Sequence, residues 1–159
     1  MVENLTTTVS SKSQTVEINR ALPTVVIGES INPTRRKKLV ETLKAHDFGF
    51  ALELAGSQIA SGAEVLDVNV GFPGVDDESL LPLTVKAIQE SVDVPLCLDS
   101  PNPKAIEAGL KVVEGKALIN SVNGEEKSLE AILPIAREYG AAVIGLVMDD
   151  DGITHDPVK

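Results

Sequence analysis

The chain has 159 residues, of which 43% are hydrophobic and 3% aromatic, and its formal net charge is -10 at pH 7. This length and composition allow one domain with an aliphatic core, whereas the acidic surface excludes a nucleic-acid partner because it repels phosphates. No apolar run approaches the roughly 20 residues of a membrane span, and residues 1–20 lack the apolar centre of a secretory signal. We therefore expect a cytoplasmic protein with no membrane partner.

Two local features add to this picture. The single cysteine, Cys97, lies inside an apolar run, which indicates a small core residue in a reducing compartment and not a disulfide. The one basic cluster is RRKK at residues 35–38, which we interpret as the solvated first turn of a helix.

Taken in chain order, residues 1–22 are polar and aperiodic, which predicts a flexible N-terminal arm before a domain over residues 23–159. In that domain, short Val- and Ile-rich runs alternate with amphipathic segments that begin or end at Gly or Pro. Strands are expected at residues 24–27, 64–70, 95–98, 117–120 and 142–147. Helices are expected at residues 32–45, 50–61, 78–92, 103–113 and 125–139, and an acidic loop at residues 148–151.

This alternation of strands and helices indicates an α/β fold with a parallel sheet, for which two architectures compete. An open doubly wound sheet needs about this length. A (β/α)8 TIM barrel needs roughly 250 residues, so the chain would supply about its first five strands. Polar residues at successive strand ends favour the barrel, because an open sheet concentrates its ligand contacts at one switch point. The first βα turn has neither a G-x-G-x-x-G nor a P-loop pattern, which argues against nucleotide binding.

Polar side chains follow the apolar runs of four strands and form one candidate site. These side chains belong to Glu29, Asp67, Asn69, Asp99 and Asn120. Carboxylates accept paired N–H bonds, and amides both donate and accept, so such a set suits a flat heterocycle such as a pterin or guanine. The alternative is that these residues only cap the helices that follow. This alternative suits the strand ends at Asp99 and Asn120 poorly, because both have apolar surroundings.

We expect no metal site, although carboxylates alone would leave Mg²⁺ open. Both histidines, His46 and His155, are expected in loops away from the strand ends. The residues alone identify no catalytic group.

Five segments, in this order and spacing, resemble the pterin-binding (dihydropteroate synthase-like) barrel family. They are GESIN at 28–32, LDVNVG at 66–71, LCLDS at 96–100, AIEAGL at 105–110 and ALINSVN at 117–123. Within that family they most resemble the methyltetrahydrofolate:corrinoid methyltransferases and the folate domain of cobalamin-dependent methionine synthase. The similarity covers residues 25–153.

The resemblance implies a methyltransferase that moves the methyl group of methyltetrahydrofolate to the cob(I)alamin of a separate corrinoid protein. It implies that Asp99 holds the amino and N–H edge of the pterin, with Asn120 beside it. Glu29 would line the same pocket, and Asp67 and Asn69 would form its floor or hold the other groups in place.

The chain also departs from the family pattern. Ser30 stands where the family usually has Arg, and the chain ends before the sixth and seventh strands, which carry an Asp and an Asn of the family's site. We therefore expect an incomplete catalytic site and exposed sheet edges that favour a homo-oligomer. The alternatives are a dihydropteroate synthase-type transferase, a non-catalytic pterin-binding module and an open flavodoxin-like domain.

Overall fold

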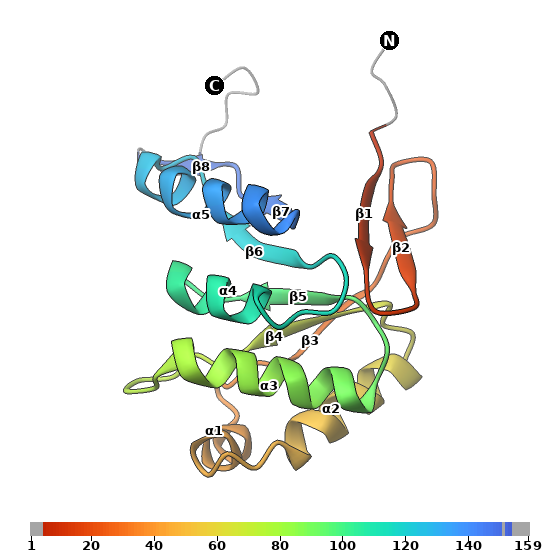
Figure 1. The fold of residues 1–159 in the computed structure, drawn as a ribbon, viewed down its shortest axis with the longest axis vertical. Helices are drawn as coiled ribbons and strands as arrows, with labels where there is room; N and C mark the ends of the chain where they lie inside the picture. The colour runs from red at the N-terminus through yellow and green to blue at the C-terminus, as the bar shows by residue number, and fades with distance from the viewer. Residues whose placement is uncertain (1–4, 151, 154–159) are drawn as a thin grey trace.

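A computed structural model of the chain describes residues 5–150 and 152–153. Within these residues a parallel sheet of five strands is flanked by five helices (Figure 1). The strands are β3 (Ile27–Ile31), β4 (Val65–Asn69), β5 (Leu96–Asp99), β6 (Leu118–Val122) and β7 (Ala142–Gly145). The helices are α1 (Lys37–Lys44), α2 (Gly49–Ala60), α3 (Asp77–Ser91), α4 (Pro103–Leu110) and α5 (Glu126–Tyr139).

The strand order distinguishes between the two expected architectures. The order in the sheet, β3-β4-β5-β6-β7, is the order in the chain, and every neighbouring pair is parallel. A doubly wound sheet reverses its order at a switch point, whereas a barrel wall adds each strand beside the previous one. The expected α/β class is confirmed, and the sheet is part of a TIM-type barrel.

Alternation along each strand gives the sheet two different faces. On β4, Leu66 and Val68 pack in the large core with the buried sides of all five helices. The intervening residues Val65, Asp67 and Asn69 face the other side, which corresponds to the inside of a barrel. The inner face is therefore apolar near the strand N-termini and polar near the C-termini.

Local capping explains why α4 begins at the predicted position and α1 does not. The Asn102 side chain accepts from the Lys104 N–H at 3.1 Å, with Pro103 at the first helical position. At α1, the Asn32 side chain instead accepts from the Thr34 N–H, and Arg35 has a φ of 59°. This turn delays the helix, predicted from residue 32, until Lys37.

The N-terminal segment contains a β-hairpin, so the prediction of a flexible arm over residues 1–22 is wrong for its paired part. β1 (Thr7–Ser10) pairs antiparallel with β2 (Thr15–Ile18). Runs of four Thr- and Val-containing residues alternate too briefly to be distinguished from polar coil in the sequence. Figure 1 shows this hairpin beside the N-terminal ends of the sheet strands. The domain boundary at residue 23 stays a prediction.

Tertiary contacts hold the hairpin in place. Val9 is fully buried. It belongs to a second apolar cluster with the inner-face residues Val65, Cys97 and Leu118. The Ser10 N–H donates to the Lys116 carbonyl at 2.9 Å, and the Lys116 N–H donates back at 3.0 Å. The hairpin therefore covers the N-terminal end of the inner face, opposite the polar end.

Beyond β7 the chain forms a second, shorter hairpin. β8 (Met148–Asp149) pairs with β9 (Gly152–Ile153), where a loop was expected. Among the described residues, no helix is long and apolar enough to cross a membrane.

Candidate functional site

Three of the five predicted site residues lie side by side at the C-terminal edge of the sheet. Asn69 of β4 is in register with Asp99 of β5, and Asp99 is in register with Asn120 of β6. Because parallel strands end at the same edge, apolar runs of similar length bring their terminal side chains together. The structure thus forms a continuous row of amide, carboxylate and amide on the inner face.

Asn69 orients the carboxylate of Asp99. The Asn69 Nδ2 donates to Asp99 Oδ2 at 2.8 Å, while the Asn69 Oδ1 accepts from the Gly71 N–H at 2.7 Å. The amide is therefore held at both ends, and its donor reaches only one carboxylate oxygen. The other oxygen of Asp99 can accept N–H groups from a ligand.

Asp67 lies one layer deeper and holds Asn120. Its side chain is in a residue only 4% exposed, and Asn120 Nδ2 donates to Asp67 Oδ2 at 3.0 Å. Burial raises the pKa of Asp67, and the neighbouring charges of Asp99 and Glu29 add to this rise; hydrogen bonds from Asn120 and Cys97 oppose it. Since its Nδ2 is bound to Asp67, Asn120 presents its amide oxygen to a ligand.

Cys97 contributes to this layer as a neutral thiol. It is fully buried and in register with Asp67. Burial, followed by the adjacent negative charge of Asp67, raises the pKa of the thiol. A thiol held in its protonated form is a poor nucleophile, so its contribution here is packing and a hydrogen bond to Asp67.

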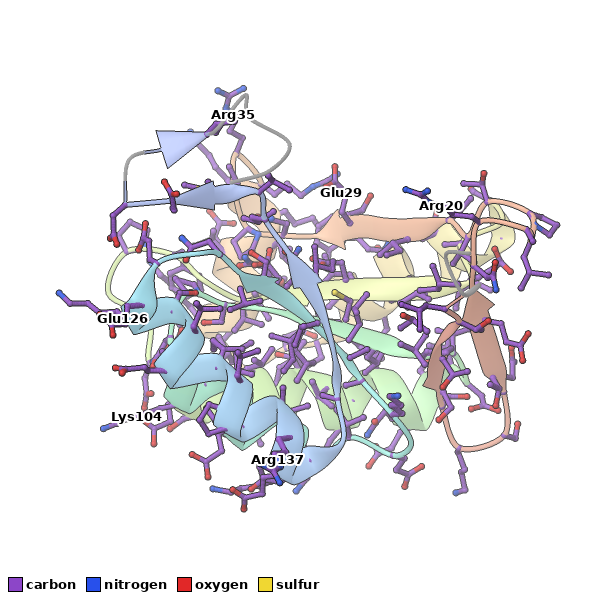
Figure 2. The ribbon with its side chains drawn as sticks, turned by 90° about the horizontal axis from the view of Figure 1, so that it is seen from above. Arg20, Glu29, Arg35, Lys104, Glu126 and Arg137 are labelled. Carbon is purple, nitrogen blue, oxygen red and sulfur yellow. The ribbon has the colours of Figure 1, made fainter. Side chains whose placement is uncertain are left out.

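Glu29 is less closely joined to the other four predicted residues. It lies on the edge strand β3, within an irregularity of the β3–β4 pairing between Gly28 and Ile31, and is exposed (Figure 2). The Ser30 N–H there donates to Gln58 Oε1 at 2.6 Å, and a Cβ at Gly28 would collide with the Gln58 side chain. Glu29 influences Asp67 through its charge alone, as far as the described contacts show.

A cavity of about 440 Å³ opens beside Asp99 and Asn120. Its wall is completed by residues from the loops at the N-terminal ends of α4 and α5, and by Leu146 beyond β7. Cavities of this size accommodate small organic ligands. Both Asp99 and Asn120 therefore border a space in which a heterocycle could meet them.

Asp77 is a supporting residue that the sequence reasoning missed, since it was assigned to a loop. It is the first residue of α3, and both its carboxylate oxygens accept hydrogen bonds from the loop after β5. Ser100 Oγ donates to Oδ2 and Asn102 Nδ2 donates to Oδ1, each at 2.8 Å. Asp77 thus fixes the loop that follows Asp99. Its sequence signal is only an acidic residue at a helix start.

No metal site emerges from the described part of the chain. Within it, no group of three or more His, Cys, Asp or Glu side chains is arranged to hold a metal ion. His46 is in the turn after α1, with a φ of 54°, and His155 lies outside the described residues. The prediction about metals stays a prediction.

Comparison with known proteins gives this site its family context. The sequence profile described as pterin binding enzyme matches residues 28–158, and the chain belongs to that family. Methionine synthase from Mycobacterium tuberculosis (strain ATCC 25618 / H37Rv) is 31% identical over 149 residues. The match covers 91% of this chain but only 12% of that protein.

Solved structures agree on the fold. The 7,8-dihydropteroate synthase from Vibrio fischeri ES114 superposes with a TM-score of 0.57 at 22% identity, covering 87% of this chain and 48% of that one. Dihydropteroate synthase from Thermus thermophilus gives 0.52 at 21% identity, covering 86% and 47%. The chain thus spans about half the length of these barrel proteins. The family expected from the five sequence motifs is confirmed.

Proposed function

We propose that the inner-face site binds the pterin ring of methyltetrahydrofolate and that the protein transfers its methyl group to the cob(I)alamin of a corrinoid protein. The observation that carries this proposal is the row Asn69, Asp99 and Asn120, in register beside a cavity of about 440 Å³. The similarity to methionine synthase supports methyl transfer in preference to other pterin chemistry.

The hydrogen-bond directions at the site match one edge of the pterin ring. Asp99 has an oxygen available beside the one that Asn69 occupies, and Asn120 turns its amide oxygen away from Asp67. Two neighbouring acceptors suit the adjacent amino group and ring N–H of a pterin. We assign Asp99 to that edge, Asn120 to the ring beside it, and Asp67 and Asn69 to holding these two in place. Glu29 lines the same pocket from the edge strand.

The chemistry of the transfer defines what the protein must supply. The bond between N5 and the methyl carbon breaks, its electron pair stays on N5, and N5 takes up a proton. A corrinoid cobalt supplies the electron pair for the new bond to carbon and belongs to the partner protein. Because an unprotonated N5 leaves poorly, a proton or a strengthened hydrogen bond must reach it by the transition state. This chain's share is to bind and orient the folate.

A dihydropteroate synthase-type transferase and a non-catalytic pterin-binding module are the competing proposals. The likeness to dihydropteroate synthases concerns the fold, which many activities share. It therefore favours neither proposal over methyl transfer.

Two measurements test the proposed function in sequence. Titration of the chain with methyltetrahydrofolate should show saturable binding, and failure to bind would remove both folate proposals. Methylation of cob(I)alamin, followed in the visible spectrum, should then depend on both the folate and the protein. Binding without any methylation would leave the non-catalytic module as the better description.

A further inference from the structure

We propose that a basic groove beside the pterin site binds the glutamyl carboxylates of the folate substrate. This inference rests on the proposed function and concerns a different part of the surface. The groove, of about 470 Å³, lies between the loop after β3 and the loop after β4. Its lining contains the cations Arg35 and Lys44, the apolar residues Pro33, Val40, Phe72 and Pro73, and no acidic residue.

The charge of this groove contrasts with the rest of the molecule. The chain carries 24 acidic and 14 basic residues, so a concave surface with two cations and no carboxylate is unusual for it. Three ion pairs occur within the described residues: Lys12–Glu114, Lys38–Glu53 and Lys111–Glu107. Neither Arg35 nor Lys44 belongs to one of them. Both charges are therefore available to an anionic ligand.

The neighbouring charged groups do not cancel those of the groove. Lys44 also borders an adjoining hollow that contains Asp76 and His46. The Asp76 carboxylate accepts from the Ser79 N–H at 3.2 Å and from the Ser79 hydroxyl at 2.7 Å, which commits it to the start of α3. Lys38 is turned toward Glu53 and lies 3.9 Å above the ring of Phe50. The groove thus keeps its positive charge.

The groove is also at the correct edge of the sheet. It follows the C-terminal ends of β3 and β4, and β4 is the direct neighbour of β5, which carries Asp99. Two strand spacings amount to about 10 Å, so the groove lies within reach of a ligand seated on Asp99. Figure 2 shows Arg35 beyond the end of β3, far from Arg137 on α5.

The ligand has parts that match those of the groove. In a folate, an aromatic aminobenzoyl group separates the pterin from the glutamyl chain, and each added glutamyl residue adds one carboxylate. Phe72 and the two prolines offer an apolar wall for the aromatic group, with the Lys44 Nζ 5.5 Å from the Phe72 ring centroid. Arg35 and Lys44 then meet the carboxylates. We therefore infer a preference for substrates with several glutamyl residues.

The experiment compares the affinity of the chain for methyltetrahydrofolate carrying one and three glutamyl residues, at low salt. We expect the triglutamate to bind about fivefold more tightly, because exposed charge pairs contribute modestly. Arg35→Asn/Lys44→Gln should reduce this ratio to below about twofold; Asn is chosen because it tolerates the positive φ at this position. Raising the salt should reduce the wild-type ratio in the same way.

A charge-matched control is Lys86→Gln/Arg137→Gln, which removes two cations from exposed positions on α3 and α5. It should keep the wild-type ratio. Equal binding of both folates by the wild type would overturn the groove assignment alone, whereas binding of neither would overturn the proposed function as well. If the groove variant kept its preference but lost affinity for a corrinoid protein, the groove would be a protein-docking surface and our assignment would be wrong.

Discussion

At the scale of single residues, the pairing of each carboxylate with an amide is what prepares the site for a ligand. Asp99 and Asp67 each accept one hydrogen bond from an asparagine, and both asparagines are thereby oriented. Each carboxylate keeps a further oxygen, and Asn120 keeps its amide oxygen. Such a prearranged set of acceptors reduces the ordering cost of binding.

Asp99→Asn should weaken methyltetrahydrofolate binding by ~1–3 kcal/mol, because it removes the charge from a charge-assisted hydrogen bond. The shape of the side chain is unchanged, so the fold should be retained. Calorimetric titration of both proteins measures the difference. The matched control is Glu90→Gln, the same chemical change at an exposed position on α3, which should bind like the wild type. An unaltered affinity for the Asp99 variant would remove its assigned role.

Asp67 predicts a pH dependence of stability. Burial raises its pKa above 3.8, so in the window from 3.8 up to the raised value the folded chain keeps a proton that the unfolded chain loses. The contribution of Asp67 to the free energy of unfolding therefore falls as pH rises through that window. Asp67→Asn should remove this part of the slope. Urea unfolding of both proteins at several pH values measures it, and parallel curves would contradict the prediction.

At the scale of elements, the N-terminal hairpin is part of the fold and separates the apolar end of the inner face from solvent. Its position is tightly specified where β1 meets the loop before β6. Gly115 has a φ of 101° there, and a Cβ at this residue would collide with the carbonyl oxygens of Ser10 and Ser11. The close approach lets the backbones of Ser10 and Lys116 exchange hydrogen bonds.

Val9→Ala should lower the free energy of unfolding by ~1–3 kcal/mol, since it removes buried methyl groups and leaves space over the inner-face cluster. Thr7→Ala, on the same strand but exposed, is the control and should change stability by less than ~0.5 kcal/mol. Chemical denaturation measures both. Equal stabilities for the two variants would mean that the hairpin contributes little to the core.

At the scale of the whole molecule, the sheet has two edges without a strand partner among the described residues. These edges are β3 and β7, and Val143, Leu146 and Val147 near the second are exposed. Unpaired backbone groups next to apolar side chains are a template for association.

We therefore predict that the chain self-associates in a concentration-dependent way. Sedimentation velocity at increasing concentration should show the average sedimentation coefficient rising. Adding a charge at the second edge, as in Val143→Lys, should shift the distribution toward the monomer. A single monomer boundary up to high concentration would contradict the prediction.

The sequence was a good guide where the signal was local. The strands after residues 64, 95 and 117 were predicted within a few residues, because apolar runs bounded by Gly and Pro are a local pattern. The cap at Asn102 and the helix end at Gly140 were evident for the same reason. The hairpin was missed, because the contact of Ser10 with Lys116 joins residues 106 positions apart.

By itself, the sequence determined the α/β class, the polar strand ends and the family, since periodicity and ordered motifs are properties of the chain alone. Only the tertiary structure decided which polar groups pair. Asn120 bonds to Asp67, 53 residues away, although Asp99 is its neighbour in register. Asp77 fixes Ser100 across 23 residues. The physical reason is that such pairings depend on strand order and register, which arise only when the helices pack on one face of the sheet.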